Sequence, residues 1–291
     1  MSHAIAVSHG EFGRAALYKL NKPIITHAHR EGHLIFYVDG TPNSVTVSDE
    51  THPNNPEFAT AVSPWAPHSY NQLENGETIC LTLYIKPMWF LENSVSAEYA
   101  LNFGSTRLRI TPAISDLTKR LTAHLLEEEV HSQFDNLLYC LTRECFDWSW
   151  KNTNDSQMRN VSGRFSDFRV RKSLRVMQER MTEDVEMEEL ARTVGLSRPH
   201  FFKLFKQQLG VTPSVYMNTL RSEQAIDDLL TTDKTVTDIA FDLGFSSQAS
   251  FTRFFSSNVG IAPSEYRRVA HVSGSTFAMM GQPTRLSGMP S

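Results

Sequence analysis

The spacing of apolar positions changes along the chain, from short alternating runs to a helical period near residue 112. Between Ala15 and Leu91, apolar runs such as Leu34–Val38 and Thr78–Ile85 are separated by turn residues such as Gly40–Asn43. Many short strands at this spacing are typical of an antiparallel barrel or jelly roll. We therefore predict a β-rich N-terminal region without a long helix between Ala15 and Leu91.

From Pro112 to Trp150 the apolar residues recur at helical spacing. One stripe consists of Ile114, Leu117, Leu121 and Leu125, and the other of Phe134, Leu137, Leu138, Leu141 and Cys145. Two amphipathic helices in succession predict an antiparallel pair with an apolar face. That face either caps the barrel or dimerises the protein, and both alternatives stay open here.

A pattern of small, apolar and basic residues then occurs twice, beyond a polar segment at 151–167 that we predict to be a linker. The first copy consists of Gly195-Leu196-Ser197, Phe201, Phe205 and Gly210–Pro213. The second copy has the matching residues Gly244-Phe245-Ser246, Phe251, Phe255 and Gly260–Pro263. Each copy predicts two short helices and a tight turn. Ala191 and Ala240 let the helices touch, and the first glycine of each copy takes a positive φ. A long helix that starts at Thr212-Pro213 joins the two copies.

The second helix of each copy has an apolar face and an outward face of hydrogen-bond donors and small residues. The outward residues are Pro199, Phe202, Lys203 and Lys206 in the first copy and Gln248, Ala249, Thr252 and Arg253 in the second. Donors and small side chains are the chemistry that reads base edges in a major groove. A helical domain whose repeats only pack on each other is the alternative interpretation.

The tandem repeat resembles the DNA-binding domain of the AraC/XylS family of bacterial transcription regulators. The resemblance covers roughly Phe168 to His271, and residues 244–255 with 260–267 are its most specific part. It implies a multi-domain α+β protein: a cupin-like effector-binding and dimerisation domain at 1–150, and an all-α domain with two helix-turn-helix motifs at 168–271. It also implies a non-enzymatic transcription regulator, activator or repressor. Promoter DNA, a small-molecule effector, a second copy of the chain and, for an activator, RNA polymerase are the partners implied.

Motif matching assigns the DNA-contacting side chains residue by residue. They are Arg198, Pro199, Phe202, Lys203, Ser247, Gln248, Ala249, Ser250, Thr252, Arg253, Arg267 and Arg268. Many family members carry polar residues where this chain has Pro199 and Phe202, so the first helix departs from the pattern, and Phe202 would touch a thymine methyl group. Arg267 and Arg268 are expected to hold phosphates, which position a protein without specifying sequence. A solvated basic pair is the alternative for these two.

Histidines gather in the β-rich region at a spacing that resembles the first cupin motif. His27 and His29 alternate on one strand, and His33 stands at the usual glutamate position of that motif. The second cupin motif is partial, and His68 falls one residue early. We predict an effector pocket lined by His27, His29, His33, Trp65, His68 and Tyr70. The four histidines are also candidate ligands of a transition metal. A barrel without metal, with Trp65 and Tyr70 as core residues, is the alternative.

Composition and charge narrow the class of protein. The net charge of −4 divides unevenly, because residues 1–158 carry 11 Lys/Arg against 18 Asp/Glu and residues 159–272 carry 16 against 14. The small basic excess in the C-terminal half favours placed contacts to DNA over a diffuse basic field. Three cysteines without C-x-x-C spacing, no apolar run of membrane-spanning length and no secretion signal predict a cytoplasmic, nucleoid-associated protein that does not enter a membrane.

Two further classes stay open at this stage. A metal-dependent cupin enzyme or a metal sensor, fused to a DNA-binding module, would need a complete set of metal ligands. An interaction protein is disfavoured by the outward Lys203, Gln248 and Arg253. The last segment, 272–291, is rich in Ser, Gly, Met and Pro and is predicted to be a disordered tail.

Overall fold

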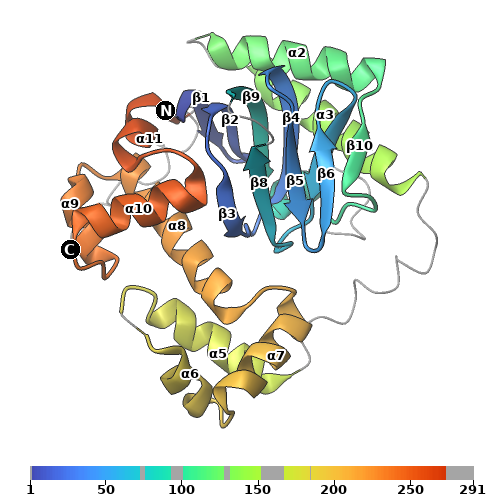
Figure 1. Ribbon diagram of the computed structural model, residues 1–291. Helices are drawn as coiled ribbons and strands as arrows, with labels where there is room; N and C mark the ends of the chain where they lie inside the picture. The colour runs from blue at the N-terminus through green and yellow to red at the C-terminus, as the bar shows by residue number, and fades with distance from the viewer. Residues whose placement is uncertain are drawn as a thin grey trace, which may run out of the picture.

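The computed structural model describes residues 2–72, 76–92, 101–127, 132–151, 167–183 and 185–272 of the 291-residue chain. It has a β-rich N-terminal region and a helical C-terminal region (Figure 1), which confirms the predicted α+β class and the order of its parts. The predicted linker at 151–167 lies outside the described residues except for its two end residues. The predicted tail at 272–291 also lies outside them, except for residue 272.

The strands among the described residues form two sheets. They are β1 (His3–Gly10), β2 (Gly13–Leu20), β3 (Ile24–His27), β4 (Gly32–Gly40), β5 (Asn43–Val47), β6 (Glu50–Asn54), β7 (Phe58–Val62), β8 (His68–Gln72), β9 (Thr78–Ile85), β10 (Arg107–Arg109) and β11 (Ala270–Val272). The larger sheet has the order β10-β7-β4-β9-β2-β1-β11, and the smaller has the order β3-β8-β5-β6. Neighbouring strands are antiparallel except β1 and β11, which are parallel.

The helices follow in two groups, one after the strands and one in the C-terminal half. They are α1 (Pro87–Glu92), α2 (Pro112–Leu126), α3 (Ser132–Trp150), α5 (Phe168–Glu179), α6 (Met187–Thr193), α7 (Arg198–Leu209), α8 (Pro213–Thr231), α9 (Val236–Asp242), α10 (Gln248–Val259) and α11 (Pro263–Val269). None of these described helices combines the length and the apolar character needed to cross a lipid bilayer.

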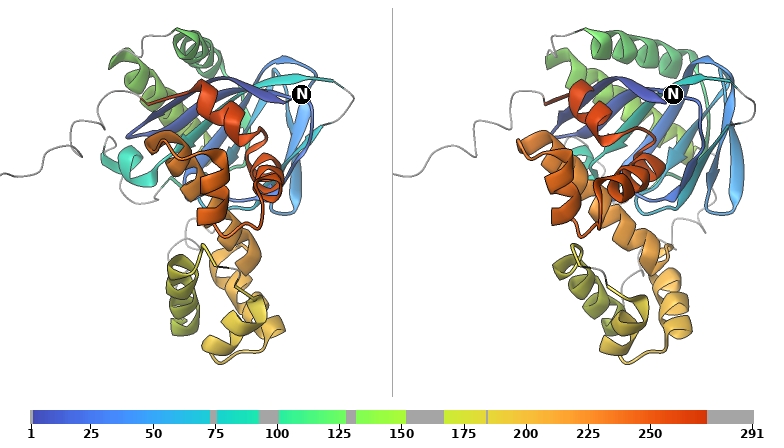
Figure 2. Two further views of the ribbon diagram at one scale, coloured as in Figure 1. Left: turned by 90° about the vertical axis from the view of Figure 1, so that its left-hand side faces the viewer. Right: turned by 60° about the vertical axis from the view of Figure 1, so that its left-hand side comes forward.

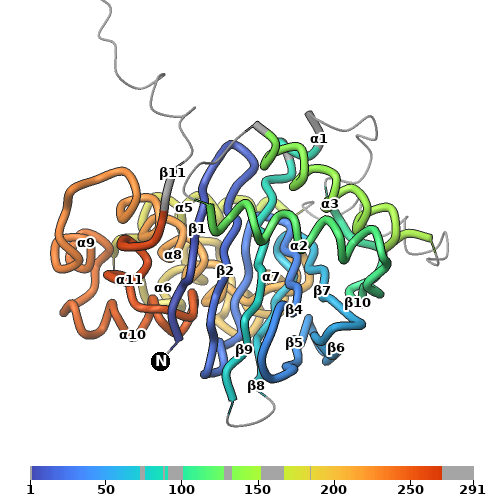
Figure 3. The backbone as a smooth tube through the Cα atoms, turned by 90° about the horizontal axis from the view of Figure 1, so that it is seen from above, coloured from blue at the N-terminus to red at the C-terminus, as the bar shows by residue number. Residues whose placement is uncertain are grey.

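Successive residues of β9 face opposite sides of the larger sheet, as the two-residue period of a strand requires. Leu81 and Leu83 are buried in one apolar cluster together with residues of α2 and α3. Cys80 and Tyr84 belong to a second cluster, which also contains residues of the smaller sheet. The N-terminal region therefore has three layers, with α2 and α3 over one face of the larger sheet and the smaller sheet on the other (Figure 3).

The apolar stripes of α2 and α3 face this chain's own sheet. Ile114 and Leu121 are fully buried, and Leu125 is nearly so, in the same cluster as Phe12 and Leu34 of the sheet. A second copy of the chain could reach these side chains only by displacing the sheet. The stripes therefore cap this chain's own sheet, which is one of the two predicted alternatives, and dimerisation of the protein stays a prediction.

Helix α8 joins two groups of helices that lie in different places. In Figures 1 and 2 the group α5–α7, in yellow, extends away from the sheets, whereas α10 and α11 of the second group, in orange and red, lie against them. Phe251, Phe255 and Tyr266 of the second group belong to the same buried cluster as Tyr18 and Tyr84 of the sheet. The second group therefore shares its core with the β-rich region.

Strand β11 brings the described end of the chain back to the N-terminal sheet. It pairs with β1 so that Val7 lies opposite Ala270 and His9 lies opposite Val272. Three residues are too few to carry a strand pattern of their own, so this pairing could not be predicted from the sequence. The contact corrects the expectation of a purely helical C-terminal domain.

Candidate nucleic-acid interface and histidine cluster

The two helix pairs, α6–α7 and α9–α10, close with the same backbone turn. Gly195 has a φ of 72° and Gly244 a φ of 79°, values that glycine adopts without steric cost. In the first pair the amide of Leu196 donates to the carbonyl oxygen of Ala191, and in the second the amide of Phe245 donates to that of Ala240, at 3.0 and 2.9 Å. The repeated sequence pattern thus produces a repeated local geometry.

Packing inside each pair depends on the small residue before the turn. Ala191 and Ala240 have no exposed surface, and neither do Phe201 and Phe205 of α7 or their counterparts Phe251 and Phe255 of α10. Because these side chains sit on the inner face, the opposite face of each second helix lies at the surface. Both second helices end at a glycine in the left-handed region, as expected for a C-terminal cap.

The outward face of α10 carries most of the predicted base-contacting residues. Gln248, Ala249 and Arg253 are exposed, and Ser250 and Thr252 are half-buried. The guanidinium of Arg253 donates to Ser250 Oγ at 3.3 Å, and Gln248 Oε1 accepts from Thr237 Oγ1 at 2.7 Å. Both contacts are exposed, so base edges can compete for these groups.

The outward face of α7 is less polar. Arg198, Pro199 and Lys203 are exposed, whereas Phe202 is half-buried and packs on the first helix group. The guanidinium carbon of Arg198 lies 5.0 Å from the ring centre of Phe202, within cation–π range. His200 is also exposed on this face and was missing from the prediction, although its place between Pro199 and Phe201 was visible in the sequence.

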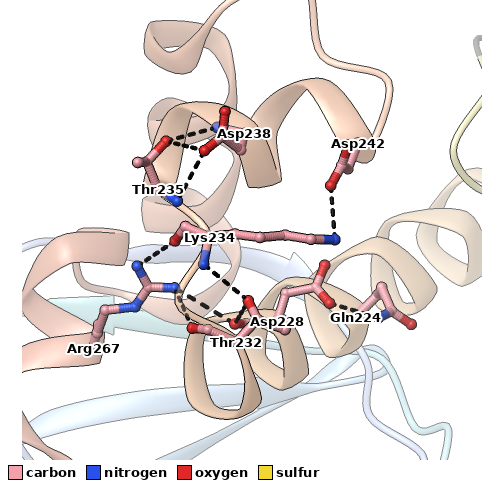
Figure 4. Close-up of polar contacts among 8 residues, drawn as sticks. All are labelled: Gln224, Asp228, Thr232, Lys234, Thr235, Asp238, Asp242 and Arg267. Carbon is pink, nitrogen blue, oxygen red and sulfur yellow. Dashed lines mark hydrogen bonds and ion pairs between the residues drawn. The ribbon is translucent and has the colours of Figure 1, made fainter.

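Two of the residues predicted to contact DNA, Ser247 and Arg267, form hydrogen bonds with backbone atoms of this chain. Ser247 caps α10, since its Oγ accepts from the amide of Ser250 at 3.1 Å. Arg267 donates to the carbonyl oxygen of Leu229 at 3.0 Å. It also donates to the carbonyl oxygens of Lys234, at 2.6 Å, Asp228 and Thr232 (Figure 4).

The guanidinium of Arg267 therefore fastens the end of α8 to the segment just before α9, and its predicted phosphate contact stays a prediction. Arg268 is exposed and pairs with Glu265 at 2.5 Å, which leaves its predicted phosphate contact untested.

The four predicted histidines come together between the two sheets. The ring centres of His27 and His68 are 4.3 Å apart, and those of His29 and His33 lie 5.2 and 4.9 Å from that of His68. One ring nitrogen of each of His27, His29 and His68 lies within 4.8 Å of the others. His27 is the last residue of β3 and His29 follows it in the loop before β4, while β8, the neighbour of β3, supplies His68.

Hydrogen bonds orient two of the rings. Nδ1 of His27 is bonded to the carbonyl oxygen of Ile25 at 2.7 Å, and Nδ1 of His68 to that of Ala66 at 3.0 Å. A backbone carbonyl only accepts, so Nδ1 carries the proton in both rings and Nε2 keeps its lone pair. Nε2 of His68 is in contact with Nδ1 of His33 at 3.0 Å. Nε2 of His29 is buried with no hydrogen-bond partner among the described residues.

Burial keeps these imidazoles neutral. It lowers the pKa of His27 to about 4, with the backbone bond to Ile25 opposing the shift. It is also the largest cause of the pKa values of His29, His33 and His68 lying well below their usual range, and the neighbouring histidines add to the shift. Neutral imidazole is the form that binds a metal ion.

The aromatic residues predicted for the effector pocket separate in the structure. Tyr70 lines a small cavity of about 30 Å³ with His27, His33 and His68. Trp65 has a positive φ of 64° and stacks on Tyr216 of α8, with ring centres 4.9 Å apart. It therefore lies at a contact between the sheets and the first helix group and does not line the histidine cavity.

Comparisons with known proteins agree with the helix geometry. A family model described as a helix-turn-helix domain matches residues 190–269. An uncharacterized HTH-type transcriptional regulator from Staphylococcus aureus is 46% identical over 85 residues, which are 29% of this chain and 11% of that protein. The chain thus covers only a small part of the length of such relatives. The predicted AraC-type resemblance of the C-terminal region is confirmed.

Two comparisons extend over most of the chain. The HTH-type transcriptional activator RhaS from Mannheimia succiniciproducens is 25% identical over 247 residues, 83% of this chain and 88% of that protein. The crystal structure of ToxT from Vibrio cholerae O395 superposes with a TM-score of 0.54 at 14% identity, over 88% of this chain and 96% of ToxT. ToxT has also been solved with an unsaturated fatty acid bound. The likeness to ToxT shows a shared fold.

Proposed function

We propose that this chain, whose C-terminal region carries an AraC-type helix-turn-helix domain, binds promoter DNA in a sequence-specific way and responds to a small molecule bound in its N-terminal region. Helices α7 and α10 are the two reading helices, each the second helix of a helix-turn-helix motif. The observation that carries the proposal is the repeated turn at Gly195 and Gly244, each followed by a helix with one buried aromatic face and one exposed face.

Helix α8 supports the use of both motifs on one duplex. It is a continuous helix of 19 residues, which spans about 28 Å at 1.5 Å per residue. Successive major grooves on one face of DNA are about 34 Å apart. A rigid joint of this length, with the contacts of Arg267 at its end, suits two helices that enter neighbouring grooves.

The N-terminal sheets form the sensor domain in this proposal. We assign them as a cupin-like fold with the histidine cluster inside, and the fatty acid bound by ToxT is a precedent for a ligand in a protein of this fold. The relatives are described as transcriptional regulators, which favours a non-enzymatic role over a metal-dependent cupin enzyme. A homodimer, or a contact with RNA polymerase, would use surfaces other than the stripes of α2 and α3.

Replacing Arg253 by alanine is expected to weaken binding to a target duplex by about 10- to 100-fold, because one bidentate base contact contributes about 1–3 kcal/mol. Binding to a scrambled duplex should change far less. Fluorescence anisotropy with both duplexes at one salt concentration measures the difference. Arg175→Ala, at an exposed arginine of α5 that is not among the predicted DNA contacts, is the control. Equal weakening of the two duplexes by Arg253→Ala would assign Arg253 to a phosphate instead of a base.

A second candidate function is metal sensing by the histidine cluster. The favouring observation is that Nδ1 of both His27 and His68 is held by a backbone carbonyl, the outer contact that orients metal-binding imidazoles. His29 supplies a third nitrogen, and zinc, iron, copper and nickel all accept such a set. At metal–nitrogen distances of about 2.0–2.1 Å the three nitrogens must approach one another more closely than 4.8 Å when a metal binds.

If the cluster binds a metal, the protein purified without a tag should take up zinc in a one-to-one ratio. His29→Ala is expected to reduce zinc affinity by about 100-fold or more, since removing a direct ligand costs more than the 10- to 100-fold typical of an outer contact. His52→Ala is the matched control, because His52 binds Thr106 outside the cluster. Elemental analysis and competition with a chelator give the two measurements. Equal zinc affinity in all three proteins would rule out the cluster as a metal site.

A further inference from the structure

A second cavity, of about 260 Å³, lies between the N-terminal sheets and α8. Its walls include Arg14 of β2, His29 and Glu31 of the loop between β3 and β4, and Ser222, Glu223 and Asp227 of α8. It is larger than the 30 Å³ cavity beside the histidine cluster, and Val259 lines both cavities. The cavity therefore touches both the proposed sensor region and the helix that joins the two reading helices.

Buried polar atoms without partners concentrate in this cavity. Nε of Arg14, Oγ of Ser222 and Oε1 of Glu223 have no hydrogen-bond partner among the described residues. Arg14 and Ser222 are only 7% and 8% exposed. A buried polar atom left unsatisfied costs about 1–3 kcal/mol, so such groups are nearly always paired in folded proteins. Several of them on the walls of one cavity indicate a polar molecule that satisfies them together.

Arg14 supplies a fixed positive charge on the sheet side. Its guanidinium lies 3.5 Å from the ring centre of Tyr84, and Nη1 donates to Tyr266 Oη at 3.0 Å. Burial, the largest single influence, lowers the pKa of Arg14, but the Coulomb interactions with Tyr266, Tyr84 and Tyr18 and the hydrogen bond to Tyr266 together raise it well above its usual range. Arginine is always charged and offers several donors in a rigid plane, which suits a carboxylate.

The α8 side of the cavity is acidic. Glu223 pairs with Arg30 through Oε2 at 2.8 Å, and its Oε1 is the atom without a partner. Glu31 and Asp227 add two more carboxyl groups to the same cavity. Acceptors of this kind bind an ammonium or hydroxyl group of a ligand. The volume is below the 300–1,000 Å³ typical of drug-sized ligands, so it suits a small metabolite.

We infer that this cavity binds a small carboxylate that also carries an amino or hydroxyl group, with the carboxylate at Arg14 and the second group at Ser222 and Glu223. The inference rests on the proposed function and adds the place and the chemical class of the effector. Such a molecule bridges the sheet and α8. Because α8 joins α7 and α10, a ligand that binds one arrangement of α8 better than another changes how the two reading helices are presented to DNA.

Isothermal titration calorimetry on the full-length chain tests this inference. The probes are the standard L-amino acids and the hydroxy acids lactate, malate and citrate. Each is compared with its amide, in which a neutral carboxamide group replaces the carboxylate. At least one carboxylate is expected to bind, and its amide should not. Ser222→Ala, which removes only the hydroxyl, should weaken that binding about tenfold. Ser214→Ala, at an exposed position of the same helix, should leave it unchanged.

Arg14→Lys should weaken binding further, but it removes contacts to Tyr266 and can disturb folding, so Ser222→Ala and Glu223→Gln carry the test. The inference is overturned if no carboxylate binds, or if both of these variants bind the probe as tightly as the unchanged protein. Target-duplex binding measured on the same preparations separates the two claims. Specific DNA binding without carboxylate binding defeats the inference alone, whereas carboxylate binding without specific DNA binding defeats the proposed function.

Discussion

Alanine in place of Gly244 is expected to destabilise the protein by about 2–5 kcal/mol, whereas the same change at Gly195 costs only about 1–2 kcal/mol. Both glycines occupy the same turn of their helix pair, with φ values of 79° and 72°, so both variants carry the cost of a left-handed residue. A Cβ at Gly244 would also collide with the carbonyl oxygen of Thr182, while one at Gly195 meets nothing within 4 Å.

Urea denaturation of the two glycine variants measures the difference directly, and each variant is the control for the other. A clearly lower midpoint for Gly244→Ala, with an unchanged slope, is the expected result. Equal midpoints would contradict the close packing of the second turn on the segment around Thr182. DNA binding by Gly195→Ala should persist at a temperature where the variant stays folded.

Acid is expected to destabilise the protein as the pH falls below 6.5, and His9 is a large contributor. Burial lowers the pKa of His9 to about 3, and the charges of Arg14 and Lys86 add to the shift. The unfolded chain takes up this proton near pH 6.5, whereas the folded chain resists it. Stability is therefore complete above pH 6.5 and is lost progressively down to pH 3, with about 3 kcal/mol lost by pH 4.

His9→Gln tests this pH dependence, because glutamine does not titrate and its side-chain oxygen can still accept from Tyr266, which contacts His9 Nε2 at 2.8 Å. The free energy of unfolding should fall less steeply between pH 6.5 and pH 4 in His9→Gln than in the unchanged protein. His3→Gln, at the start of the same strand, is the control. If His9→Gln keeps the full pH dependence, His9 does not carry this share of the acid lability.

The helix pairs could be predicted from the sequence because their signals are local. These signals are a glycine at the turn, a proline after the helix cap at Pro213 and Pro263, and aromatic residues at helical spacing. Each of them acts over one or two helical turns. The position of the second pair against the sheets carries no such signal. Tyr266 belongs to the repeated pattern, but its partners His9 and Arg14 lie more than 250 residues away.

The candidate site residues also fall into those that a local pattern predicts and those whose positions depend on tertiary contacts. Strand alternation predicts that His27 and His29 lie on one side, and the structure brings them together. The roles of Trp65 and Arg267 depend on tertiary partners, namely Tyr216 and the carbonyl oxygens at the end of α8, which no local pattern reveals. The cavity at Arg14 and Ser222 was missed because its walls come from distant segments.

Selection of binding sites from a random DNA pool by the full-length protein, followed by footprinting of the enriched sequence, tests the central claim most directly. The account predicts an enriched sequence with two protected segments on one face of the duplex, centred about one helical turn, roughly 34 Å, apart. Arg253→Ala should relax the sequence preference in one of the two segments only. A bound pool with no enriched sequence, or protection confined to a single groove, would contradict the claim that α7 and α10 read DNA together.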